Sequence, residues 1–223
     1  MWHGYISARR RHSQAGGPDL IGVAQTGGCL TITINRPDKA NALTEAMLSK
    51  LADTVLAATD PVLVLTGAGR VFSAGADLED VRGGTLATSP EWERLSAAVA
   101  RFEGLSIAAL NGSCAGGALG MVLACDLRIA VPTSKFFYPV MKMGVLPQPS
   151  DPARLRALVG KAAAKRILLA GVRIEAPEAL ALGLIDEVCS ADAMPDRLTE
   201  WMAPAVAGGA ARVMAIKQMI DAP

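Results

Sequence analysis

Apolar and polar residues follow two different periods in the first part of the chain. Residues 30–34 alternate between Leu or Ile and Thr, which is typical of a half-buried strand. Thr44 can cap a helix, and the apolar residues after it follow the helical period: Met47, Leu48, Leu51, Val55 and Leu56. Residues 62–65 are an unbroken apolar run, which predicts a strand covered on both faces.

Strands and helices continue to alternate further along. The pattern predicts a helix over 91–103 and buried strands over 106–110 and 127–131. A further helix begins near Asp151, which is placed to cap it, with Pro152 at the first helical position. Its expected buried stripe is Leu155, Leu158, Val159, Ala162 and Ile167. Residues 196–223 are expected to form one or two helices, so the chain is predicted to be α/β with a largely parallel sheet.

Composition narrows the class of protein. The chain has 223 residues, of which 51% are hydrophobic and 19% charged, so it can bury a sizeable core. The net charge of +1 argues against a nucleic-acid partner, and no apolar run is long enough to span a bilayer, so no membrane partner is expected. No CxxC pair occurs, which favours reduced thiols in a cytoplasmic protein over a zinc site; the cysteines are Cys29, Cys114, Cys125 and Cys189.

The first 19 residues differ from the rest and are expected to form a flexible tail. They contain three consecutive arginines and a Gly-Gly-Pro break, so a targeting or lipid-binding arm is the alternative. Both histidines of the chain, His3 and His12, lie there. The body therefore cannot use Ser-His-Asp or Cys-His catalysis or a histidine metal site, and we expect no metal.

Two glycine-rich turns carry the candidate chemistry, at 66–78 and 111–120. Each follows an apolar strand and is dominated by Gly, Ala and Ser, which leave backbone N–H groups accessible to a ligand. Two such amides aimed at one point would stabilise an oxyanion by about 3 kcal/mol per donor. The alternative is that both turns are packing devices, and neither is a GxGxxG or GK[ST] nucleotide motif.

Several motifs together resemble the enoyl-CoA hydratase/isomerase (crotonase) superfamily over about residues 23–219. They are Asn35-Arg36-Pro37-x-Lys39-x-Asn41-Ala42-Leu43, the Phe72–Leu78 segment, Asn111-Gly112 with Ala-Gly-Gly, and Cys125–Ala130. Further matches are Phe136, Pro139, Gly144, Leu168-Leu169-x-Gly171 and Ala181-x-Gly183-Leu184-Ile185-Asp186.

The resemblance implies a crotonase-like ββα superhelix with a helical C-terminal part, assembled as homotrimers or hexamers. It divides the chain into the tail at 1–19, an acyl-CoA-binding core at 20–195 and a C-terminal helical segment at 196–223 that is shorter than in the family. It also implies that an acyl-CoA binds bent, with its thioester oxygen held by the amides of Ala76 and Gly117. Coenzyme A is part of the substrate, so no separate cofactor is expected.

Further substrate contacts follow from the same resemblance. Arg36 and Lys39 are candidates for the CoA phosphates, and the backbone around Ala74, Asp77 and Leu78 would face the adenine. The remaining implied binding positions are Ala40, Gly116, Gly120, Pro139 and Val140.

The sequence departs from the family where hydratases carry two glutamates. Those positions correspond to Gly120 and Val140, and neither residue can act as the acid or base that hydration needs. These small residues also predict a bulkier or branched acyl group. The possible substitutes, each with a plainer structural alternative, are Asp151 (helix cap), Tyr138 (core), Glu79 (solvated), Cys114 (packed) and Gln148, whose amide is a poor nucleophile.

Three functions remain open on the sequence. One is an enzyme of this superfamily with decarboxylase- or thioesterase-type chemistry, in which oxyanion stabilisation is most of the work. Another is a non-catalytic acyl-CoA-binding protein. The third is a hydratase or isomerase that uses a displaced carboxylate such as Asp151.

Overall fold

The computed structural model describes residues 19–84 and 86–222, so most of the expected N-terminal tail lies outside the described residues. The described chain forms two mixed β-sheets. The six-stranded sheet has the order β1 (Ile21–Thr26), β2 (Cys29–Ile34), β3 (Val62–Gly67), β5 (Leu105–Leu110), β7 (Leu127–Ala130) and β10 (Glu187–Val188). The four-stranded sheet has the order β4 (Val71–Ser73), β6 (Ser113–Ala115), β8 (Lys135–Phe137) and β9 (Ile174–Glu175).

The chain repeats one connection between the sheets. Each of β3, β5 and β7 lies in the large sheet, and a short strand of the small sheet follows it: β4, β6 or β8. A helix comes next in each repeat: α2 (Leu78–Gly83), α4 (Ala118–Ala124) or α5 (Val140–Met143). The large sheet is parallel from β2 to β10, and β1 pairs antiparallel at its edge. The predicted α/β class and the ββα repeat are therefore confirmed.

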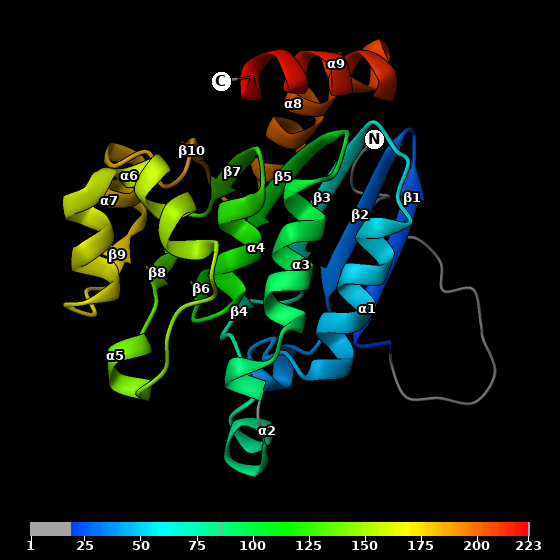
Figure 1. Ribbon diagram of the computed structural model, residues 1–223. Coiled ribbons are helices and arrows are strands. Elements are labelled where there is room, and N and C mark those ends of the chain that lie inside the picture. Colours follow the sequence, from blue (N-terminus) through cyan, green and yellow to red (C-terminus); the bar gives the residue numbers. More distant parts are fainter. Residues whose placement is uncertain (1–18, 85, 223) are drawn as a thin grey trace.

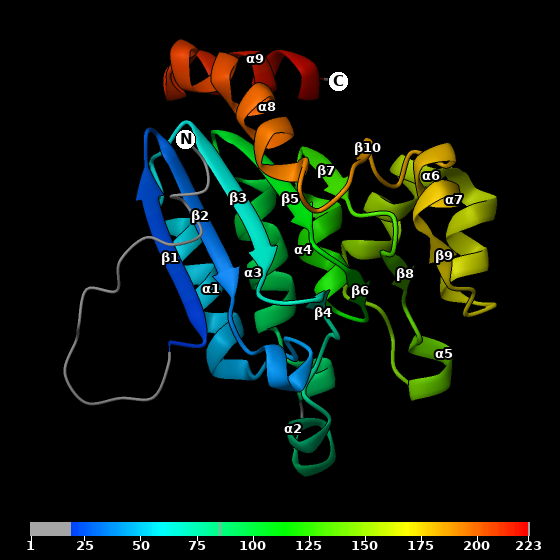
Figure 2. The ribbon, with the colours of Figure 1, turned by 180° about the vertical axis from the view of Figure 1, so that it is seen from behind.

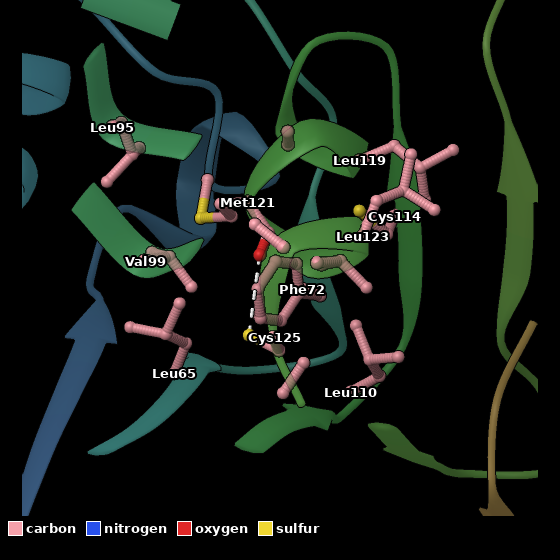
Figure 3. Packing of buried hydrophobic residues seen from close by; sticks show 14 of the residues in the cluster. Leu65, Phe72, Leu95, Val99, Leu110, Cys114, Leu119, Met121, Leu123 and Cys125 are labelled. Carbon is pink, nitrogen blue, oxygen red and sulfur yellow. Dashed lines mark hydrogen bonds between the residues drawn. The ribbon is translucent and has the colours of Figure 1, made fainter. Parts of the chain in front are cut away.

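Helices cover both faces of the large sheet. α1 (Glu45–Leu56), α3 (Glu91–Ala100) and α4 cover one face, as Figures 1 and 2 show. On the other face, Met194, Leu198 and Met202 of α8 (Met194–Gly208) pack against β3, β5 and β7. Figure 3 shows the larger core around α4, where Phe72 and Leu119 are fully buried. Apolar burial on both faces explains why the central strands are unbroken apolar runs.

The predicted start of α1 is confirmed. The Thr44 hydroxyl accepts a hydrogen bond from the Met47 amide at 3.3 Å, and the stripe that follows is buried except for Leu56 at the end of the helix. This cap satisfies one of the free amides that every helix N-terminus leaves.

The helix α6 (Asp151–Leu168) differs from its prediction in two ways. Asp151 is its first residue, but its side chain turns into the protein instead of capping the helix. Gly160 has φ 76° and ψ 168°, which interrupts the helix and shifts the phase of the second half. Ala162 is therefore exposed, and Ala163 and Ala164 are buried in its place.

The predicted C-terminal helices are α8 and α9 (Ala210–Asp221). Lys217 anchors α9, because its ammonium group donates to the carbonyls of Phe102 (2.7 Å) and Gly104 (3.1 Å) and to the Asp126 carboxylate (2.9 Å). Asp126 in turn accepts from the amide and hydroxyl of Ser106 in β5. Lys217 thus ties the last helix to the sheet, and none of the residues of α9 is fully buried.

Replacing Lys217 by Gln should release α9. The substitution removes the charge-assisted hydrogen bond to Asp126. A hydrogen bond of this kind is worth about 1.5–3 kcal/mol. We expect hydrogen–deuterium exchange in 210–221 to rise strongly while exchange in β3 and β5 stays slow. Arg212→Gln, on the exposed side of the same helix, is the matched control and should leave exchange unchanged. Equal protection in both variants would contradict the anchoring role.

Candidate functional site

The two glycine-rich turns meet in the structure. A Cβ placed on Gly75 would lie 2.7 Å from the carbonyl oxygen of Ala115 and 3.5 Å from the Cα of Gly116. Gly75 also has φ 89°, a conformation that favours glycine. Residues about 40 positions apart in the sequence are therefore in backbone contact, as the shared-oxyanion hypothesis requires.

Backbone pairing fixes the first turn and leaves one amide free. The Leu43 amide donates to the Gly75 carbonyl at 2.8 Å, and the Asp77 amide donates to the Leu43 carbonyl at 2.9 Å. In this parallel arrangement Ala76 points its own N–H away from Leu43. Within the described residues the Ala76 amide donates to no protein acceptor.

The second turn leaves an amide free at the start of α4. The Gly116 amide donates to the Phe137 carbonyl at 3.0 Å, and Leu119 and Gly120 begin the helical hydrogen bonds. The Gly117 amide comes between them and has no protein acceptor among the described residues. Trp92 fixes its position, because a Cβ on Gly117 would lie 2.9 Å from the indole ring.

Both turns border one pocket of about 130 Å³. Its walls come from the turns, from α2 and from the segment around α5, and Figure 1 shows α2 and α5 projecting from the same end of the molecule. The lining side chains that the structure describes are all uncharged: Ala74, Ala76, Leu78, Val81, Ala87, Trp92, Gly116, Gly117, Tyr138, Pro139, Val140, Met143, Val145, Leu146 and Gln148. Such a lining suits an apolar group with a single polar point.

The comparisons with known proteins agree with this geometry. Residues 24–223 match the sequence profile described as enoyl-CoA hydratase/isomerase. This chain belongs to the enoyl-CoA hydratase/isomerase (crotonase) family.

Two curated family members illustrate the likeness. The chain is 37% identical over 173 residues to the 2,3-dehydroadipyl-CoA hydratase of Escherichia coli, covering 73% of this chain and 66% of the relative. It is 35% identical over 192 residues to 4-chlorobenzoyl coenzyme A dehalogenase-2 of an Arthrobacter species, covering 81% and 70%. The chain thus spans about two thirds of the length of these relatives.

Solved structures show the family fold. A crystal structure of an enoyl-CoA hydratase/isomerase from Pseudoalteromonas atlantica superimposes with a TM-score of 0.83 at 29% identity, covering 91% of this chain and 82% of the other. The α/β crotonase fold, with two mixed sheets and C-terminal helices, is therefore shown.

Some residues implied by the family resemblance lie outside the lining. Ala40 has φ 49° and holds the Ala74 amide through its carbonyl at 2.9 Å. Arg36 forms an ion pair with Asp77, and Asp77 also caps α2 by accepting from the Glu79 amide at 2.9 Å. These contacts lower the pKa of Asp77, the Arg36 guanidinium most of all. Lys39 pairs with Glu79 at 3.3 Å on the surface.

Gly120 is also absent from the lining, because the Asp151 carboxyl covers it. A Cβ on Gly120 would lie 2.8 Å from Asp151 Oδ1 and 2.9 Å from Oδ2. The expectation that Gly120 leaves room for a bulkier acyl group is therefore wrong. Only the absence of a side chain at position 120 lets this carboxyl reach its place.

Asp151 is not a helix cap but a buried carboxyl beside the pocket. It is 1% exposed, and its Oδ2 accepts a hydrogen bond of 2.8 Å from the hydroxyl of Tyr138, which lines the pocket. Its Oδ1 has no partner among the described residues. Arg154, one turn along α6, donates instead to Ser96 at 2.6 Å.

Burial raises the pKa of Asp151 from its ordinary value of 3.8 to about 6. The Tyr138 hydrogen bond and the charge of Arg154 lower it, and the charge of Glu93 raises it. Burial and the neighbouring carboxyl also raise the pKa of Tyr138 strongly, so that its hydroxyl stays neutral. A carboxyl that titrates near pH 6 can both accept and release protons.

Two other acid/base candidates have structural roles. Cys114 is fully buried, and burial raises the pKa of its thiol strongly, so it is a packed residue. Glu79 is exposed and paired with Lys39. The other cysteines are also free thiols. No group of three or more potential metal ligands occurs in the part of the chain that the structure describes.

Part of the pocket wall could not be predicted from the sequence. Trp92 lies on the apolar stripe of α3, so the sequence pattern predicts a core residue. It is buried, and its Nε1 donates to the Leu86 carbonyl at 2.8 Å. Its ring nevertheless borders the site. Of α2 and α5, the family resemblance placed only their first residues, Leu78 and Val140, at the site. Val81 and Met143 also line the pocket, but they carry no sequence signal beyond being apolar.

Asp151→Asn should stabilise the protein at high pH. The folded-state pKa is above the unfolded value, so the folded state holds the proton more tightly and the wild type loses stability as pH rises from about 4 to about 6. Above pH 6 this loss is at most about 3 kcal/mol. We expect urea unfolding to show Asp151→Asn more stable than wild type at pH 8, by an amount that shrinks toward pH 4. A constant difference across this range would contradict the buried-carboxyl account.

Proposed function

We propose that this protein is an acyl-CoA enzyme that holds the thioester carbonyl oxygen between the backbone amides of Ala76 and Gly117. The observation that carries the proposal is that both amides lack a protein acceptor within the described residues and border the same apolar pocket. A thioester oxygen is the one polar atom of an acyl group and would satisfy both donors. As negative charge develops on it, these hydrogen bonds strengthen.

The nucleotide part of CoA is proposed to follow α2. Arg36 and Lys39 would contact its phosphates, and the backbone of Ala74, Asp77 and Leu78 would face the adenine. Lys39 suits this role because it is half exposed and is paired with a surface carboxylate, Glu79, which a phosphate can displace at little cost. Arg36 is held by Asp77, which fixes the position of its guanidinium.

Ordinary hydration through carboxylates at positions 120 and 140 is not part of the proposal, since the chain has Gly120 and Val140 there. Chemistry that depends mainly on oxyanion stabilisation, such as decarboxylation or thioester hydrolysis, fits these residues better. A non-catalytic acyl-CoA-binding protein is the second candidate. The half-paired carboxyl of Asp151 beside the pocket favours an enzyme, because pure binding gives it no role.

Assembly and location are extensions of the proposal. A homotrimer or hexamer would cover the exposed apolar side chains of α9, which are Ile216, Met219 and Ile220. No helix within residues 19–84 and 86–222 has the length and apolar character of a membrane span. A cytoplasmic location is consistent with the free cysteines.

Removing the carbonyl oxygen from the ligand should weaken binding. Hexanoyl-CoA and its thioether, S-hexyl-CoA, differ in that atom, and losing its hydrogen bonds should raise the Kd roughly tenfold or more. Calorimetry with both ligands, and with free CoA as the control, measures this difference. Equal affinities would contradict the oxyanion hole, and no binding of any of them at millimolar concentration would remove the acyl-CoA assignment.

An acyl chain that ends in a carboxylate should bind poorly. Among the side chains that the structure describes, the lining contains no Lys, Arg or His, so a buried carboxylate would lose its hydration without a partner there. We expect adipoyl-CoA to bind roughly tenfold or more weakly than hexanoyl-CoA, which has the same chain length. The Kd of adipoyl-CoA relative to that of hexanoyl-CoA should fall when the adipoyl carboxylate is methylated. Equal Kd values for hexanoyl-CoA and the free acid would contradict an uncharged acyl site.

A further inference from the structure

The buried carboxyl of Asp151 has no structural role that accounts for its position. It does not cap α6, it forms no ion pair among the described residues, and one of its oxygens has no partner. A half-satisfied buried carboxyl destabilises a fold. Gly120 must lack a side chain to admit it, so two positions of the chain are committed to this arrangement.

Tyr138 connects this carboxyl with the pocket. Tyr138 is part of the lining, and its hydroxyl donates to Asp151 Oδ2 at 2.8 Å. The same hydroxyl accepts a hydrogen bond from the backbone amide of Gln148, another lining residue, at 3.5 Å. The hydroxyl oxygen is therefore held between the pocket wall and the carboxyl, and its proton points toward Asp151.

We propose that Tyr138 and Asp151 form the proton-transfer pair of the acyl-CoA site, in which the Tyr138 hydroxyl exchanges a proton with the α-carbon of the bound thioester and Asp151 takes up and returns that proton. The inference rests on the proposed function, because it needs a thioester in the pocket. Tyr138 is the group that meets the substrate, and Asp151 is a positioning residue that acts through it.

The step is balanced without a further reactant. The α-C–H bond breaks, and its electron pair forms an enolate whose oxygen accepts from the amides of Ala76 and Gly117. The proton goes to Tyr138 Oη as the tyrosine's own proton goes to Asp151 Oδ2. The transfer runs backwards to restore the thioester. Oδ1 accepts no hydrogen bond from the described residues, so its negative charge is less stabilised than that of a fully paired carboxylate, which makes Asp151 a stronger base.

Exchange of the α-protons in D₂O tests the pair without knowledge of the natural substrate. Wild-type protein should exchange deuterium into the α-carbon of hexanoyl-CoA, followed by mass spectrometry. Asp151→Asn keeps an oxygen for the tyrosine but takes up no proton, and Tyr138→Phe removes the relay. Both should slow exchange about a hundredfold, while the Kd of hexanoyl-CoA changes less than threefold.

The pH profile separates proton transfer from a purely structural role. Exchange by the wild type should rise with pH through about 6, as Asp151 loses its proton, and this inflection should be absent in Asp151→Asn. The charged and titratable groups around the pair are Arg154 on α6, Glu93 on α3 and Cys114 on β6. Glu93→Gln is the matched control, because Glu93 accepts from the Ser150 amide and is not part of the lining. It should keep the exchange and move the inflection to lower pH.

The outcomes of these experiments distinguish the Tyr138–Asp151 proton-transfer proposal from the acyl-CoA-binding proposal. Failure of the wild type to bind hexanoyl-CoA would overturn the proposed function itself. Binding without exchange above the buffer rate, or unchanged exchange in both variants, would overturn the proton-transfer pair and leave the binding proposal intact. If Asp151→Asn does not fold, as judged by circular dichroism, Tyr138→Phe decides the matter, since it keeps the buried ring.

Discussion

The close approach of two backbone turns is the constraint on which the site depends. At Gly75 the first turn passes so near to Ala115 that no side chain fits between them. The hydrogen bonds with Leu43 hold the first turn, and the bond from Gly116 to Phe137 holds the second. Each of these contacts joins segments distant in sequence, so the site forms only when these segments are brought together by the tertiary fold. The scaffold thus places two free amides without any side chain taking part.

The same dense packing determines what the side chains around the pocket contribute. Backbone atoms supply the contacts proposed for the thioester oxygen, so most of the surrounding side chains need only fill space. The pocket wall is accordingly built mainly from apolar residues, with Tyr138 and Gln148 as polar exceptions, and the nearby charges of Arg36 and Asp77 neutralise each other. Asp151 is the exception, because it places a titratable group in the interior where packing alone would prefer an apolar side chain.

Much of the fold followed from the sequence because its signals are local. Strict alternation marked β2, an unbroken apolar run marked β3, and Thr44 with its stripe marked α1. The family motifs placed Ala76 and Gly117 in the two turns. The short strands β4, β6 and β8 have three residues each and no readable period, so they depend on tertiary pairing.

The incorrect expectations arose where tertiary contacts overrode local preference. Asp151 followed by proline is typical of a helix start, but its side chain accepts a hydrogen bond from Tyr138 and none from the first amides of α6. The stripe of α6 lost its phase at Gly160. Gly120 suggested empty space, yet a residue 31 positions later fills it. Such departures from local rules are expected at functional positions.

Trp92 and Gly117 show how the fold limits its own evolution. The indole ring occupies the volume into which any side chain at position 117 would extend. A larger residue at position 117 would fit only if Trp92 were first replaced by a smaller side chain. That replacement alone would leave a cavity beside the pocket. The two positions are therefore expected to co-vary among homologous sequences, with tryptophan at one and glycine at the other inherited as a unit.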